Sequence, residues 1–165
     1  MQRRPTLAAC FVVVAAFASG CPGAAEGVCG LSTVVPGDDE VASGRGTATR
    51  SDGEAFDEAG SWTANGDVTI GLLSFVGGKD EAGIDLAQLI SAGSFPICQR
   101  LGDRSETVGQ GIFGGLVTSA THTGALSILG LEDGVLSGRF DVEVANPAGT
   151  EVVQFTDGAF RVPQQ

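Results

Sequence analysis

The strict alternation of apolar and charged residues between Arg139 and Val144 constrains the fold of this chain more than any other feature. The order is Arg-Phe-Asp-Val-Glu-Val. A period of two places alternate side chains on opposite faces of an extended strand. The alternation therefore predicts a half-buried strand in which Phe140, Val142 and Val144 face a core. The charged residues between them, Arg139, Asp141 and Glu143, are predicted to face water.

Turn residues that follow this strand predict a C-terminal meander. The sequence Asn-Pro-Ala-Gly at Asn146–Gly149 is typical of a turn, because proline presets φ and asparagine and glycine tolerate positive φ. Residues 152–155 then form the returning strand, Asp157-Gly158 a second tight turn, and residues 160–162 a last short strand. In this arrangement Phe155 and Phe160 face the core, and Arg161 faces water.

Similar signals divide the rest of the chain into short strands. Asn65-Gly66 predicts a type I′ hairpin turn that pairs Trp62 with Val68 or Ile70. Pro96 predicts an edge position or the start of a strand. Further strands are expected over Leu31–Val35 and Ala82–Leu86, and one helical turn over Ala87–Ala92. With turn signals every 8 to 12 residues or so, we predict an all-β fold. Residues 29–165 would form a single antiparallel β-sandwich or small β-barrel of about nine or ten short strands.

Residues 1–20 have the organisation of an export signal. Arg3 and Arg4 precede an apolar run of about 11 residues, whereas roughly 20 are needed to cross a bilayer. The run ends in Ala18-Ser19-Gly20-Cys21, which resembles the lipobox of bacterial lipoproteins, although that pattern prefers leucine where Ala18 stands. There the cysteine receives a diacylglycerol, and the peptide before it is removed. We therefore expect lipidation at Cys21 and a flexible tether over residues 21–28. A plain secretory signal cut near the same place is the alternative.

The remaining cysteines predict a disulfide. Of four cysteines, Cys10 lies in the expected leader and Cys21 at the expected lipid site, which leaves Cys29 and Cys98. An even pair in an exported chain favours a disulfide. Metal binding by these two thiols alone, in a chain with a single histidine, is the less favoured interpretation.

The charge balance excludes one class of partner. The chain has 9 basic and 20 acidic residues, and loss of Arg3 and Arg4 with the leader leaves a net charge of −13. Such a body repels phosphate backbones, so no nucleic-acid partner is expected.

The end of the chain is similar to that of uncharacterised bacterial lipoproteins. The similarity lies in Leu-Ser-Gly-Arg-Phe at Leu136–Phe140, in Phe-Thr-Asp-Gly-Ala-Phe-Arg-Val at Phe155–Val162, and in the preceding Gly124–Ile128. The similarity covers about the last forty residues, and in addition the leader. The resemblance implies a compact antiparallel β domain behind a lipobox and a place at a bacterial envelope membrane. It implies no activity.

Three patterns associated with chemistry have simpler explanations. Gly109–Gly114 matches GxGxxG, but the dinucleotide fingerprint requires a preceding strand and a following helix, and the chain holds 26 glycines. His122 is the only histidine, and although Ser119 and Ser127 are near it in sequence, no Gly-x-Ser-x-Gly elbow exists. The carboxylate pairs lack EF-hand spacing and are expected to be solvated acids; they are Asp38/Asp39 and Glu132/Asp133. We therefore predict no catalytic, cofactor-binding or metal-binding residues.

These observations favour a non-enzymatic, lipid-anchored domain with a structural, adhesive or ligand-binding role. It would be exported and held at an envelope membrane by the acyl chains on Cys21, with a protein or glycan partner left open. One alternative is an exported hydrolase with two carboxylates about 5–10 Å apart in a cleft. Another is a small-ligand carrier with a sealed apolar cavity of several hundred Å³.

Overall fold

The computed structural model describes residues 28–80, 82–102, 109–119 and 121–165, so the leader, Cys21 and most of the tether lie outside the described residues. The described part contains ten strands, one α-helix and one 3-10 turn. Their bounds are η1 Val28–Gly30, β1 Arg45–Arg50, β2 Ala55–Trp62, β3 Val68–Ile70, β4 Leu73–Val76, α1 Leu86–Ala92, β5 Ile97–Leu101, β6 Gln110–Phe113, β7 Leu116–Val117, β8 Gly124–Glu132, β9 Val135–Ala145 and β10 Val152–Pro163.

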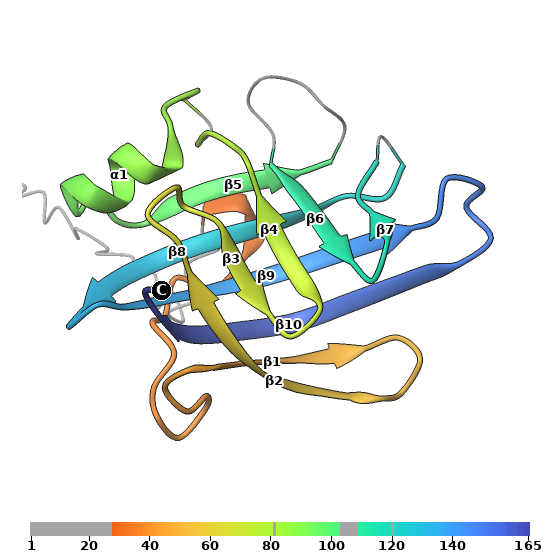
Figure 1. Ribbon diagram of the computed structural model, residues 1–165, viewed down its shortest axis with the longest axis horizontal. Helices are drawn as coiled ribbons and strands as arrows, with labels where there is room; N and C mark the ends of the chain where they lie inside the picture. Colours follow the sequence, from red (N-terminus) through yellow and green to blue (C-terminus); the bar gives the residue numbers. More distant parts are fainter. Residues whose placement is uncertain (1–27, 81, 103–108, 120) are drawn as a thin grey trace, which may run out of the picture.

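The ten strands belong to one antiparallel sheet that closes on itself. Its order is β10-β1-β2-β3-β4-β6-β7-β9-β8-β5, and β9 also pairs with β10. On the edge of β9 that does not face β10, the sheet closes through a single residue pair, Val117 of β7 with Ala145 of β9. In Figure 1 the long strands β8, β9 and β10 lie side by side, and β3, β4 and β6 cross them. The predicted all-β sandwich or barrel is confirmed.

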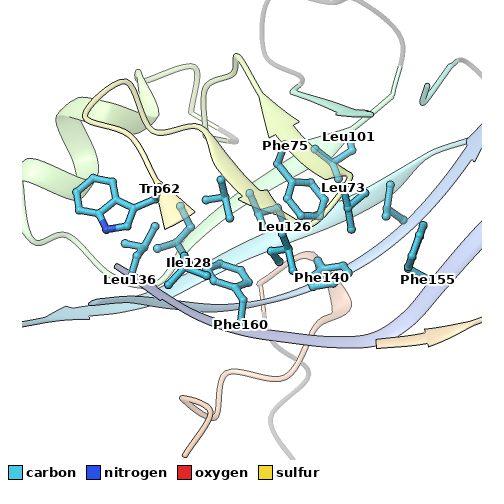
Figure 2. Close-up of a cluster of buried hydrophobic side chains, with 14 of the residues drawn as sticks. Trp62, Leu73, Phe75, Leu101, Leu126, Ile128, Leu136, Phe140, Phe155 and Phe160 are labelled. Carbon is cyan, nitrogen blue, oxygen red and sulfur yellow. The ribbon is translucent and has the colours of Figure 1, made fainter. Parts of the chain in front are cut away.

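The interior of the closed sheet is filled by side chains from both groups of strands. Phe75 on β4, Phe140 on β9 and Phe160 on β10 are at most 1% exposed, and Figure 2 shows them with their aliphatic neighbours. The predicted core positions are all buried, namely Phe140, Val142, Val144, Phe155 and Phe160. The inner face of β9 and β10 was therefore predicted correctly.

The repeated Gly-x-Phe pattern at the chain's end has a packing role. β9 and β10 pair Gly138 with Phe160, and Phe140 with Gly158. A Cβ atom on Gly158 would lie 2.6 Å from ring carbons of Phe140, and one on Gly138 would overlap the ring of Phe160. Each phenyl ring thus occupies the space above the glycine of the other strand. A glycine in a strand commonly marks such a close approach.

The predicted turn at Asp157-Gly158 is wrong, because β10 runs through it. The pairing with β9 continues on both sides, and the register shifts between Phe155 and Gly158. Asp157 has a φ of 53°. This is a β-bulge, in which one strand absorbs an extra residue without reversing. The long partner strand β9 supplies pairing on both sides, so the local turn signal is overridden.

The hairpin after Trp62 forms with the predicted pairing but with another turn. Trp62 pairs with Val68 as expected. Gly66 has a φ of 85°, whereas the φ of Asn65 is not positive. The amide of Gly66 donates to the carbonyl of Thr63 at 2.9 Å, and that of Thr63 to Asp67 at 2.9 Å. A longer loop with one left-handed glycine therefore replaces the type I′ turn, which needs two positive φ values.

Two predicted strands are absent from the described part of the chain. Instead of a strand over Ala82–Leu86, Gly83 turns with a φ of 81°, and the Asp85 side chain caps α1 by accepting from the amide of Ala87 at 2.9 Å. The predicted helical turn is thus a slightly longer helix. Leu31–Val35 forms no regular strand, because it lies flat across the sheet, as described below. Pro96, as predicted, immediately precedes a strand, β5, which ends the sheet order.

Candidate functional site: a groove beside the disulfide

A segment before β1, residues 29–44, crosses the outer face of the sheet; we call it the N-terminal strap. It is the orange segment in Figure 1. At its start Cys29 is joined to Cys98 of β5 by a disulfide, with the two Cα atoms 5.9 Å apart. At its end the amide of Gly44 donates to the carbonyl of Arg161 on β10 at 2.6 Å. Leu31 and Val41 are buried. The predicted disulfide is therefore present and fixes the beginning of the strap.

Two arginines of the C-terminal meander hold the strap to the sheet. Arg139 donates to both carboxylate oxygens of Glu40, at 2.6 and 2.8 Å, and to the carbonyl of Val34 at 2.9 Å. Arg161 is paired with Asp38. The outer face of β9 and β10 was expected to face water, and it does carry the charged residues, but the strap covers part of it. For this reason Arg139 and Arg161 are only partly exposed.

The strap's first residues form one wall of an open groove of about 660 Å³. The strap contributes Cys29, Gly30 and Leu31, the end of β5 contributes Arg100, Leu101 and Gly102, and β8 with the residue before it contributes Thr123, Gly124 and Ala125; Asp141 of β9 completes the lining. In the cross-strand register Arg100 is opposite Ala125, which is opposite Asp141. The residue between the two charged ones, Ala125, has only a methyl side chain.

The fold clearly perturbs the ionisation of Asp141, which lines this groove. Burial raises the pKa of its carboxyl, and the negative charge of Asp157 adds to the rise. Hydrogen bonds from the backbone of Asp157 and Gly158 oppose it, the first of them at 2.8 Å. The bulge in β10 therefore fixes the carboxyl's position. A perturbed acid in a groove is a reason to consider a functional site.

The raised pKa makes a prediction about stability and pH. The ionised carboxyl is less favourable in the folded chain than in the unfolded one, so Asp141 lowers stability as pH rises from its ordinary value of 3.8 through the raised value. Asp141→Asn keeps an oxygen acceptor for the bulge amide but carries no charge. We expect the variant to gain stability relative to wild type between about pH 3 and pH 7, measured by urea unfolding. A relative loss over that range would contradict the assignment.

His122 is a member of a hydrogen-bonded pair. Its Nδ1 lies 2.6 Å from Oε1 of Glu143 on β9, and both side chains are partly buried. A hollow of about 230 Å³ lies beside it. Within the described residues no serine hydroxyl is bonded to His122: that of Ser119 lies 3.4 Å from the hydroxyl of Thr121, and Ser127 is buried on β8. The arrangement ties the loop before β8 to β9, and the described residues assemble no catalytic triad around His122.

The residues of the other sequence patterns are not among the described residues that line the groove. Gly109–Gly114 forms β6 and the start of its turn into β7, with Gly114 and Gly115 at positive φ, and so opens no helix. Of the acidic pairs, Glu132 and Asp133 are at the exposed turn between β8 and β9, and Asp38 pairs with Arg161. Among the residues that the structure describes, no three histidine, cysteine or acidic side chains are grouped so that they could hold a metal ion.

Sequence reasoning identified the disulfide of this site but missed its acid. Asp141 was assigned to a solvent-exposed face. Only the bulge opposite it and the strap beside it distinguish it from the other charged residues of that face. A signal existed in Asp157-Gly158, since this pair inside a long strand is compatible with a bulge as well as with a turn.

Comparison with known proteins identifies no relative: no family model, curated protein or solved structure matches this chain. No helix in the described part of the chain has the length and apolar character that crossing a membrane requires.

Proposed function

We propose that the chain is an exported lipoprotein, anchored to a bacterial envelope membrane through Cys21, whose β domain binds a ligand in the groove beside Asp141. The proposal includes no enzymatic activity. Its strongest support is the disulfide between Cys29 and Cys98, because such bonds persist in oxidising compartments outside the cytosol. The leader and the lipobox-like residues before Cys21 point to the same location.

The groove supports binding more than catalysis. It is open, its lining includes the small residues Gly124 and Ala125, and its polar groups come from separate strands held by the sheet. Among its described lining residues Asp141 is the only acid. A ligand would meet a rigid floor with a few fixed polar groups, the usual design of a binding site.

The anchor is tested by labelling cells with a fatty-acid probe. The wild-type chain is expected to be labelled and to sediment with membranes, and Cys21→Ala is expected to lose the label entirely and to leave the membrane fraction. Cys10→Ala is the matched control, because Cys10 lies in the expected leader and should leave labelling unchanged. Equal labelling of wild type and Cys21→Ala would refute the anchor.

One observation favours a second function, hydrolysis by two carboxylates. The charge of Asp157 contributes to the raised pKa of Asp141, as the charge of a second carboxylate does for a general acid. Asp157, however, is exposed and does not line the groove. Release of reducing sugar from an envelope glycan that is lost in both Asp141→Asn and Asp157→Asn would favour this hydrolase over a binding module.

A further inference from the structure

The groove lies where the tether leaves the folded body. Its wall begins at Cys29, which the disulfide fixes to β5. Between Cys21 and Cys29 a fully extended chain spans at most about 28 Å. With an acyl chain on Cys21, the groove would therefore remain close to the lipid head groups. This step depends on the anchor proposed above.

The groove presents two opposite charges at either side of a small-residue floor. Asp141 on β9 and Arg100 on β5 are separated by Ala125 of β8 in the same cross-strand row. Two strand spacings put their backbones about 10 Å apart. The aspartate side chain is short and the arginine side chain is long, and both line the groove. A ligand that spans this row needs a cationic and an anionic group a few atoms apart.

The cationic end of the ligand has to donate hydrogen bonds. A carboxylate is an acceptor, and one oxygen of Asp141 already receives the amide of Asp157. A primary ammonium offers three N–H donors, whereas a trimethylammonium offers none. The anionic end faces the guanidinium of Arg100, which already has a partner in the folded chain but carries five N–H donors in a planar fork that suits phosphate.

We propose that the groove binds a phosphoethanolamine group, with the ammonium on Asp141 and the phosphate on Arg100. Both a membrane lipid and a soluble compound carry this chemistry. The short tether favours the lipid head group, because the anchored body meets it at high local concentration.

Titration calorimetry with the detergent-solubilised full chain tests the chemistry without the membrane. Phosphoethanolamine is expected to bind more tightly than ethanolamine or inorganic phosphate, each of which satisfies one charge. Asp141→Asn should weaken binding of phosphoethanolamine by about tenfold and abolish that of ethanolamine. Arg100→Gln should weaken phosphoethanolamine similarly but leave ethanolamine unchanged. Asp67→Asn is the matched control, because Asp67 also accepts a backbone amide, from Gly77, but lies outside the groove.

Several results would overturn this assignment. They are absence of phosphoethanolamine binding at roughly 10 mM ligand, equal binding of inorganic phosphate and phosphoethanolamine, or wild-type affinity in Asp141→Asn. Because the compound is soluble, loss of lipidation at Cys21 together with intact binding would defeat the anchor alone. Absence of binding in a lipidated chain would defeat this inference alone.

Hydrogen exchange in vesicles distinguishes a lipid head group from a soluble compound as the source of the phosphoethanolamine. Amides at Gly124 and Ala125 should exchange more slowly when the lipidated chain sits in vesicles containing phosphatidylethanolamine than in phosphatidylcholine alone. Equal exchange in both, together with binding of the free compound, would assign the site to a soluble phosphoethanolamine instead.

Discussion

Phe140→Ala is expected to lower the free energy of unfolding by about 3–5 kcal/mol, because lost transfer energy and the cavity left behind add. The Phe140 side chain is fully buried, with its ring centroid 5.2 Å from that of Phe75 and 6.5 Å from that of Phe160. Gly158 lies opposite it on β10 and has no side chain to fill the space. Domains of this size are stable by roughly 5–15 kcal/mol, so the urea midpoint should fall sharply.

Glu143→Ala on the outer face of the same strand is the matched comparison. Its carboxylate bonds to His122 at 2.6 Å, and a partly exposed pair of this kind contributes about 0.2–1 kcal/mol. We therefore expect a loss below about 1 kcal/mol. A larger loss from Glu143→Ala than from Phe140→Ala would mean that the strand faces are inverted, since a shift of one residue exchanges them.

Removal of the disulfide is expected to cost about 4 kcal/mol. Cys29 and Cys98 are 69 residues apart, and on the chain-entropy model a loop of this length restricts the unfolded chain strongly. The variant with both Cys29→Ala and Cys98→Ala should therefore have a much lower melting temperature than wild type, measured by circular dichroism.

A dithiol reductant provides the control for this comparison. It should lower the melting temperature of the wild-type chain towards that of the double variant and leave the double variant unchanged. If alkylation shows both wild-type thiols to be reduced while the melting temperature stays the same, the disulfide contributes nothing to stability.

Local patterns were enough to predict the inner surface of this fold. The alternation around Phe140 identified the buried face of β9, because a period of two leaves a side chain little choice of face once the strand forms. Trp62 was paired correctly with Val68, since strand formers on both sides of a short loop determine that register. In both cases the decisive contacts lie within a hairpin and depend on neighbouring sequence.

The outer surface depends on contacts between distant segments, which local patterns do not contain. Arg139 holds Glu40 and the carbonyl of Val34, about a hundred positions earlier in the chain. No periodicity at Leu31–Val35 predicts that this segment lies across strands rather than forming one. The bulge at Asp157 likewise depends on pairing with β9. Asp141 owes its burial and its fixed carboxyl to both features, so the candidate site emerged only with the fold.

One mass-spectrometric measurement tests export, the lipid anchor and the attachment of the strap together. Arg45, Lys79 and Arg100 are cleavage sites for trypsin, so protein isolated from its envelope and digested without reduction should yield residues 21–45 joined to residues 80–100. This cross-linked species, with a diacylglycerol mass on Cys21, is the result that we expect. Two separate peptides with free thiols, or a first peptide that lacks the acyl mass, would contradict it.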